Sequence, residues 1–104
     1  MTRRSLPNRR RSETFDIEHA GQTYSVSTGL YRDGSIGEVF VQAAKTSSMI
    51  EAIARDAAIL MSLALQYGCP AEALGHAVTR EANESPSSLI GAVLDSLPGN
   101  GGQP

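Results

Sequence analysis

The sequence contains no tryptophan, and only 5% of its 104 residues are aromatic. The core must therefore be built from aliphatic side chains, which supply most of the 40% hydrophobic content. Cys69 is the single cysteine, which excludes a disulfide within the chain and is typical of proteins of the reducing cytoplasm. No run of about 18 apolar residues is present, so we expect no membrane span. Length and composition predict one small cytoplasmic domain.

Residues that carry out chemistry are also scarce. The soft metal ligands are His19, His76 and Cys69, and none of them has the paired spacing of a metal site. Cys69 has no identifiable base beside it, the carboxylates are spread singly, and no glycine-rich loop joins a strand to a helix. We expect no catalytic residue, no cofactor and no bound metal. An enzyme that depends on Cys69 is the alternative, and it predicts a loss of activity in Cys69→Ser.

Positive charge is concentrated at one end of the chain. The net charge is −2, yet residues 1–11 hold five of the nine basic residues and none of the 11 acidic ones. The five are Arg3, Arg4, Arg9, Arg10 and Arg11. Because residues 1–12 contain few apolar side chains, we expect them to form a flexible basic arm on an acidic body.

The basic arm is the strongest candidate site for binding phosphate groups. If all five arginines contacted duplex DNA, the logarithm of the affinity would fall with the logarithm of salt with a slope of about −4 to −5. No aromatic side chain lies between the arginines, so the arm would stack no bases and read no sequence. A solubilising tail and an arm that folds back on the acidic body are the alternatives.

Alternation of apolar and polar residues predicts three β-strands, at residues 14–19, 22–31 and 36–43. Asp33-Gly34 is typical of a hairpin turn between the second and third strands. The third strand is apolar on both faces around residues 39–41, so we expect it at the centre of the sheet. Gly37 indicates a bulge or a close backbone approach within this strand.

The longest apolar pattern, residues 46–68, has helical spacing. Ser48 and Glu51 form a predicted capping box at its start, and Gly68 is suited to end it. Because apolar residues surround most of this helix, we expect it to be covered on several sides. Asp56 is the exception. We expect it to pair with Arg55, Arg80 or a backbone amide, or else to face a partner.

Two shorter helices are predicted at residues 71–80 and from Ser85-Pro86 to residue 97. The order of elements predicts an α+β fold: a three-stranded antiparallel sheet followed by a long central helix and two shorter helices. We divide the chain into the basic arm (1–12), a single domain (13–97) and a disordered tail (98–104). The open sheet edges and a bare sheet face favour a homodimer.

Several segments together resemble the TSCPD domain, which is found at the C-terminal side of adenosylcobalamin-dependent (class II) ribonucleotide reductases. The residues that carry the resemblance are Asp33-Gly34, GEVFV (37–41), Lys45 and SLALQYG (62–68). The resemblance covers residues 6–97, nearly all of the predicted domain. The family's namesake Thr-Ser-Cys-Pro-Asp would fall at residues 83–87, where the chain keeps only Pro86 and has Ser85 in place of the thiol.

The resemblance implies a module without reductase activity. In the family, the catalytic barrel, the redox cysteines and the cobalamin site lie outside this domain, and radical reduction needs more than one cysteine. We therefore expect a free-standing, non-catalytic accessory or regulatory module in deoxyribonucleotide synthesis and DNA replication. Its expected partners are a ribonucleotide reductase subunit, a nucleotide or nucleic acid. The alternative is a small nucleic-acid-binding protein that uses the basic arm.

Overall fold

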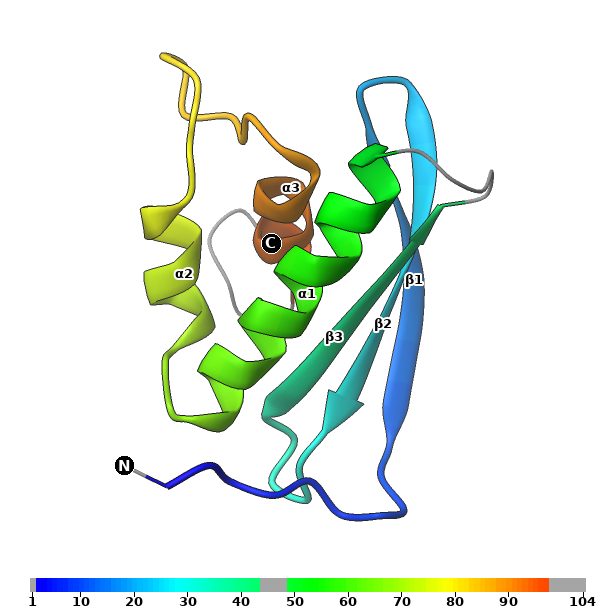
Figure 1. Ribbon diagram of the computed structural model, residues 1–104, viewed down its shortest axis with the longest axis vertical. Coiled ribbons are helices and arrows are strands. Elements are labelled where there is room, and N and C mark those ends of the chain that lie inside the picture. The colour runs from blue at the N-terminus through cyan, green and yellow to red at the C-terminus, as the bar shows by residue number, and fades with distance from the viewer. Residues whose placement is uncertain (1, 44–48, 98–104) are drawn as a thin grey trace.

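The computed structural model describes residues 2–43 and 49–97 and confirms the predicted α+β fold (Figure 1). Three strands precede three helices. Their bounds are β1 (Ser12–His19), β2 (Gln22–Leu30), β3 (Ile36–Ala43), α1 (Met49–Gln66), α2 (Ala71–Ala77) and α3 (Leu89–Ser96). The last helix begins later than predicted, because Ser88 rather than Ser85 is its N-cap and accepts a hydrogen bond from the Gly91 N–H. Ser48 and residues 98–104 lie outside the described residues.

The sheet has the order β1-β2-β3 with both pairs antiparallel. The prediction that the third strand is central is therefore wrong. Two short hairpin connections place consecutive strands side by side, which leaves the second strand in the middle. The two apolar faces of β3 have different surroundings: Val39 and Val41 are buried in the core, whereas Phe40 is 57% exposed.

Gly37 confirms both readings of its position. The pairing of β2 with β3 shifts by one residue here, so Gly37 is the extra residue of a bulge. A Cβ atom on Gly37 would lie 2.6 Å from the Tyr31 ring and 2.7 Å from Leu6. Glycine is required because the basic arm and the hairpin approach the strand so closely here.

Side chains of α1 cap the outer edge of β3 at Gly37 and Val39. The Ser62 hydroxyl accepts a 2.8 Å hydrogen bond from the Val39 N–H, and the Gln66 amide donates a 2.8 Å bond to the Gly37 carbonyl. These backbone groups would otherwise be free to pair with a further strand. Ser62 and Gln66 belong to the SLALQYG segment and their partners to the GEVFV segment, so the two motifs bind each other.

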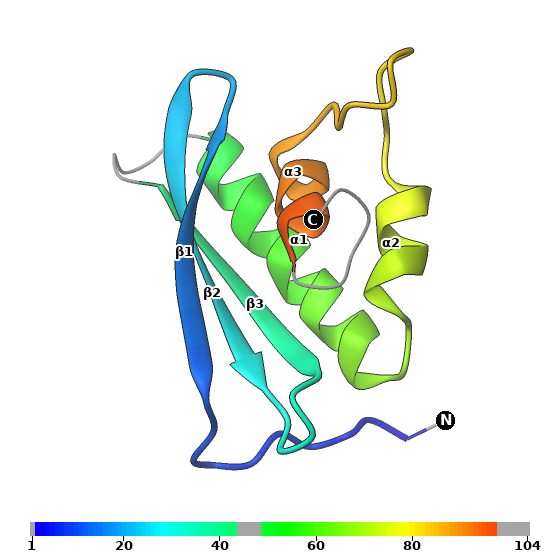
Figure 2. The ribbon, with the colours of Figure 1, turned by 180° about the vertical axis from the view of Figure 1, so that it is seen from behind.

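The core lies between one face of the sheet and the helices. α1 packs on β3, α3 packs on β1 and α1, and α2 packs on the outside of α3 (Figures 1 and 2). Apart from Thr28, the most deeply buried large side chains are aliphatic, as the scarcity of aromatics predicts: Val26, Val39, Val93, Leu94 and Leu97. None of the helices in the described ranges has the length and apolar character needed to cross a membrane.

The prediction that the central helix is covered on several sides is wrong. Ala54, Ala58 and Met61 face the core, but Met49, Ile53, Ile59 and Leu60 each expose between 57% and 79% of their surface. The cause is the number of layers. The sheet and α3 lie on one side of α1, and Figures 1 and 2 show no other element on its opposite side. The end of the helix is as predicted, with Gly68 at a φ of 98°.

Asp56 does not have the predicted internal partner. It is exposed, and no hydrogen bond or ion pair joins it to the rest of residues 2–43 and 49–97. Arg80 instead binds Asp95 on α3 through two hydrogen bonds of 2.6 and 2.8 Å, and donates further bonds to the Gly75 and Glu84 carbonyls. Arg80 thus ties α2, the following loop and α3 together.

The Arg80–Asp95 pair predicts a pH-dependent part of the stability. Hydrogen bonds from Arg80 lower the pKa of Asp95 below its usual value, so the pair stabilises the fold above about pH 4. This stabilisation is lost as the pH falls through the folded-state pKa. In urea unfolding, we expect Asp95→Asn to be less stable than the wild type at pH 7, with the difference shrinking below pH 4. A difference that stays constant from pH 7 to pH 2.5 would contradict this role.

Candidate functional site

The basic arm runs across one end of the domain, from the C-terminal end of α1 to the start of β1 (Figure 1). Backbone hydrogen bonds hold it at both ends, from the Arg4 N–H to the Gln66 carbonyl (2.8 Å) and from the Leu30 N–H to the Arg11 carbonyl (2.9 Å). The Arg3 Nε also donates to the Gln66 side chain at 2.6 Å. The arm therefore folds back on the domain, which is one of the two alternatives given in the sequence analysis. Its flexibility in isolation remains a prediction.

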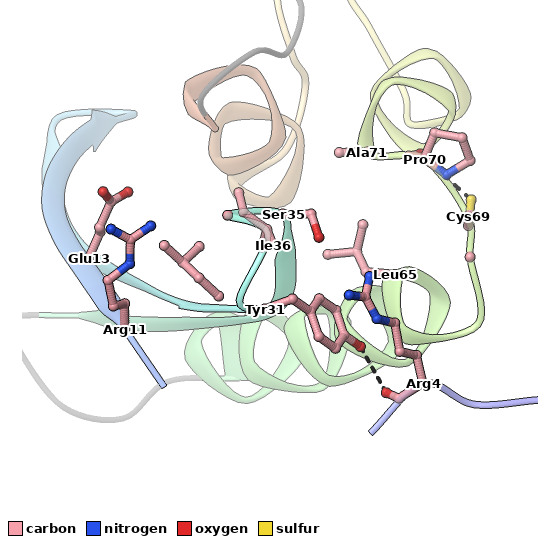
Figure 3. Close-up of a pocket in the computed structure, with 13 residues that line it drawn as sticks. Arg4, Arg11, Glu13, Tyr31, Ser35, Ile36, Leu65, Cys69, Pro70 and Ala71 are labelled. Atoms are coloured by element: carbon pink, nitrogen blue, oxygen red, sulfur yellow. Dashed lines mark hydrogen bonds between the residues drawn. The ribbon is translucent and has the colours of Figure 1, made fainter. Parts of the chain in front are cut away.

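Arg4 is bound to the hairpin between β2 and β3. Its guanidinium lies 3.7 Å from the centroid of the Tyr31 ring, and the Tyr31 hydroxyl donates a 2.8 Å hydrogen bond to the Arg4 carbonyl (Figure 3). A longer contact of 3.4 Å joins Arg4 to Asp33. Hydrogen bonds from Ser35, with a contribution from Arg4, lower the pKa of Asp33 to about 2. Asp33 is therefore ionised at any physiological pH.

Arg10 also has partners within the chain. Its Nε lies 2.6 Å from the Glu38 carboxylate, and its Nη1 donates to the Pro7 carbonyl at 2.6 Å. Three of the five arm arginines (Arg3, Arg4 and Arg10) thus bind the domain or the arm itself. Their charges are already opposed by acidic or polar groups, so they are less available to an external anion.

Arg9 and Arg11 lie beside a third arginine, Arg32, which the sequence reasoning missed. The three border a cavity of about 230 Å³ between the arm and the end of β2. Across residues 2–43 and 49–97, no hydrogen bond or ion pair is found for these three guanidinium groups. The pairing of β1 with β2 could have indicated this position of Arg32. If the register is continued past the Ser12–Gly29 pair, residue 9 lies opposite residue 32.

A second, larger cavity of about 490 Å³ is shown in Figure 3, and it shares Arg11, Leu30 and Tyr31 with the first. It lies between the arm, the β2–β3 loop and the connection from α1 to α2, and Arg4 and Glu13 also border it. Cys69 lies at its far side, half-buried, with its thiol 3.7 Å from the Pro70 carbonyl. Arginines line both cavities, and a concentration of positive charge of this kind is suited to an anion. We call the exposed Arg9, Arg11 and Arg32 the basic rim.

Comparison with known proteins identifies the family. A sequence model of the TSCPD domain matches residues 1–97. The chain belongs to the TSCPD domain family. The vitamin B12-dependent ribonucleotide reductase of Agrobacterium fabrum is 39% identical over 77 residues, which are 74% of this chain and 6% of the reductase. That of Rhodopirellula baltica is 39% identical over 72 residues, 69% of this chain and 7% of the reductase. No solved structure matches the chain.

The TSCPD chain therefore spans less than a tenth of the length of these reductases. The motifs that carry the resemblance have structural roles here, since Ser62 and Gln66 bind the β3 backbone and Gly37 makes room for Tyr31. No group of three metal-binding side chains occurs within the described ranges. Arg9, Arg11 and Arg32 of the basic rim are exposed and have no hydrogen bond or ion pair among the described residues.

Proposed function

We propose that this TSCPD chain is a non-catalytic accessory module that acts with a vitamin B12-dependent ribonucleotide reductase and binds phosphate groups at its basic rim. The relation to the reductases supports the association, because their matching part is a small module and not the bulk of the enzyme. The observation that carries the binding proposal is the convergence of Arg9, Arg11 and Arg32 on one cavity. Guanidinium groups bind phosphate oxygens through paired hydrogen bonds, and these three have no internal partners among the described residues.

The binding proposal predicts that the affinity for nucleic acid depends less on salt than it would if all five arm arginines took part. Because three arginines and not five are available, the slope of log affinity against log salt should be about −2 to −3 for nucleic acid. We expect Arg9→Gln, Arg11→Gln and Arg32→Gln each to make this slope about one unit shallower. Fluorescence titration of single-stranded DNA and of ATP at several salt concentrations measures both affinity and slope, and shows whether a nucleotide or a polynucleotide is preferred.

Arg55→Gln is the matched control for these titrations, because it removes one exposed arginine from α1, away from the rim. Equal effects of Arg55→Gln and Arg32→Gln would show attraction to net charge and would contradict a site. Deletion of residues 1–11 is a poorer test. It also removes the contacts of Arg3 and Arg4 with Gln66 and so disturbs the fold.

The accessory role is tested with a purified vitamin B12-dependent reductase. We expect the chain to bind the reductase in a sedimentation or interferometry titration, and to change its nucleotide reduction rate or its response to nucleotides. A chain that binds ATP but leaves the reductase unbound and unchanged would contradict the accessory role and leave the phosphate site standing. The two parts of the proposal can therefore fail separately.

A further inference from the structure

The exposed side of α1 carries a regular stripe of large side chains. Its positions are separated alternately by four and three residues: Met49, Ile53, Asp56, Leu60, Leu63 and Tyr67. We call these six residues the outward stripe. This is the heptad spacing with which one helix packs along another. The residues opposite the stripe, Ala54 and Ala58, already face the core. The stripe is therefore a second packing surface on the same helix, and it is not used within the described part of the chain.

The spacing of the outward stripe is the same in both directions along the helix. If a second α1 lay antiparallel to the first, Met49 would meet Tyr67, Ile53 would meet Leu63 and Asp56 would meet Leu60 of the other copy. Every pair occurs twice, as a two-fold axis requires. We propose that two copies of the TSCPD chain associate through the outward stripe, with their α1 helices antiparallel across a two-fold axis at the level of residue 58.

The exposed area is enough for a weak, specific dimer. Met49, Ile53 and Leu60 of the outward stripe expose between 62% and 79% of their area, and Tyr67 exposes 43%. A fully exposed side chain of this size offers roughly 150–200 Å², so these residues present on the order of 500 Å² in one copy. Two copies would bury roughly 1,000 Å², about the lower limit for a specific interface. We expect a dissociation constant on the order of 10–100 μM.

Other surfaces are poorer candidates for self-association. Ser62 and Gln66 cap the outer edge of β3 at Gly37 and Val39, so a second copy cannot extend the sheet at that end of the strand. The sheet face opposite the helices is polar, with Ser25, Ser27 and Asp16 on it and Phe40 as its large exposed apolar residue. The sequence predicts a homodimer from open sheet edges and a bare sheet face. We instead place the interface of the proposed homodimer on α1.

Asp56 sets the register of the proposed pair. An acidic residue in an apolar seam lowers the affinity, but it also disfavours arrangements in which the two carboxylates would meet. In the antiparallel arrangement each Asp56 faces Leu60 and the two acids do not meet. We expect Asp56→Leu to tighten association at least tenfold.

Engineered cysteines test the arrangement directly. In a Cys69→Ser background, we expect Met49→Cys with Tyr67→Cys to form a disulfide-linked dimer under mild oxidation. Within one copy these positions are about 27 Å apart along the helix, so a disulfide can form only between copies. Each single variant should remain uncrosslinked. Efficient crosslinking of the single variants would indicate a parallel pair, and no crosslinking in the double variant would show that no such pair exists. Either result overturns the proposal.

Sedimentation equilibrium between 1 μM and 1 mM tests the surface without crosslinks. We expect the wild type to dimerise across this range, and Leu60→Lys to weaken association at least tenfold. Phe40→Lys is the matched control, because it places the same charge at an exposed apolar position on the other face of the sheet. Circular dichroism verifies that both variants are folded. A wild type that is monomeric at 1 mM, or a dimer weakened by Phe40→Lys and not by Leu60→Lys, contradicts the proposal.

Discussion

Leu94→Ala is expected to lower the free energy of unfolding by about 2–5 kcal/mol. Leu94 lies in α3 and is 1% exposed, among the aliphatic residues that fill the space between the sheet and the helices. Removing three carbon atoms there loses their burial and leaves a cavity. Val26, Val39 and Val93 of the same buried core have β-branched side chains with restricted rotamers, so they can fill little of it. Because a domain of this size has a net stability of only about 5–10 kcal/mol, the loss is a large part of the total.

Urea unfolding and thermal unfolding measure this effect. We expect the melting temperature to fall by about 8–40 °C, since each kcal/mol shifts it by about 4–8 °C in a domain of this size. Leu60→Ala is the matched control, because it makes the same chemical change at an exposed position. At 1–2 μM, where the chain is monomeric, Leu60→Ala should change the stability by less than about 0.5 kcal/mol. Equal losses in the two variants would show that Leu94 is not in a close-packed core.

The sequence predicts the elements of this fold well because their signals are local. The alternation in residues 14–19 and 36–43 and the glycine at position 68 each depend on neighbours a few residues away, and the structure bears them out. The order of the strands and the exposure of α1 could not be predicted in this way, because they depend on contacts between distant parts of the chain. Apolar periodicity shows which side chains avoid water, but it does not show how many elements are available to cover them. The described residues form one helical layer, so within them one side of α1 remains open.

The sequence predicts only part of the candidate site, because the rest also depends on contacts between distant residues. The five arm arginines are evident as a charge cluster, but the sequence does not show that Arg10 binds Glu38 or that Arg3 binds Gln66. These partners are separated by 28 and 63 residues and meet only in the folded chain. Arg32 is a single charge in an acidic stretch, and it joins the site because the first hairpin brings residue 32 beside residue 9. Long-range contacts thus decide which charges remain available.

Gln66→Leu is expected to cost about 2–4 kcal/mol of stability, because this side chain joins three parts of the fold. Gln66 is 6% exposed, donates to the Gly37 carbonyl on β3 and accepts from the Arg3 guanidinium. Leucine has nearly the same volume, but it can neither donate nor accept a hydrogen bond. The buried Gly37 carbonyl would be left without a partner, which costs about 1–3 kcal/mol. The hydrogen bond from the exposed Arg3 would also be lost, which costs about 0.5–1.5 kcal/mol because water can replace it. We therefore expect a loss of stability together with release of the arm.

Gln66→Glu separates the two roles of this residue. Glutamate can still accept from Arg3, now as an ion pair, but it cannot donate to the Gly37 carbonyl. We expect it to lose stability while the arm stays in place, whereas Gln66→Leu exposes the arm to trypsin, which cleaves after its arginines. Gln42→Leu, at an exposed position on β3, should affect neither property. If the three variants were cleaved by trypsin at the wild-type rate, Gln66 would not hold the arm. The arm would then be held by its other contacts, among them the backbone hydrogen bonds from Arg4 to Gln66 and from Leu30 to Arg11 and the Arg10–Glu38 pair.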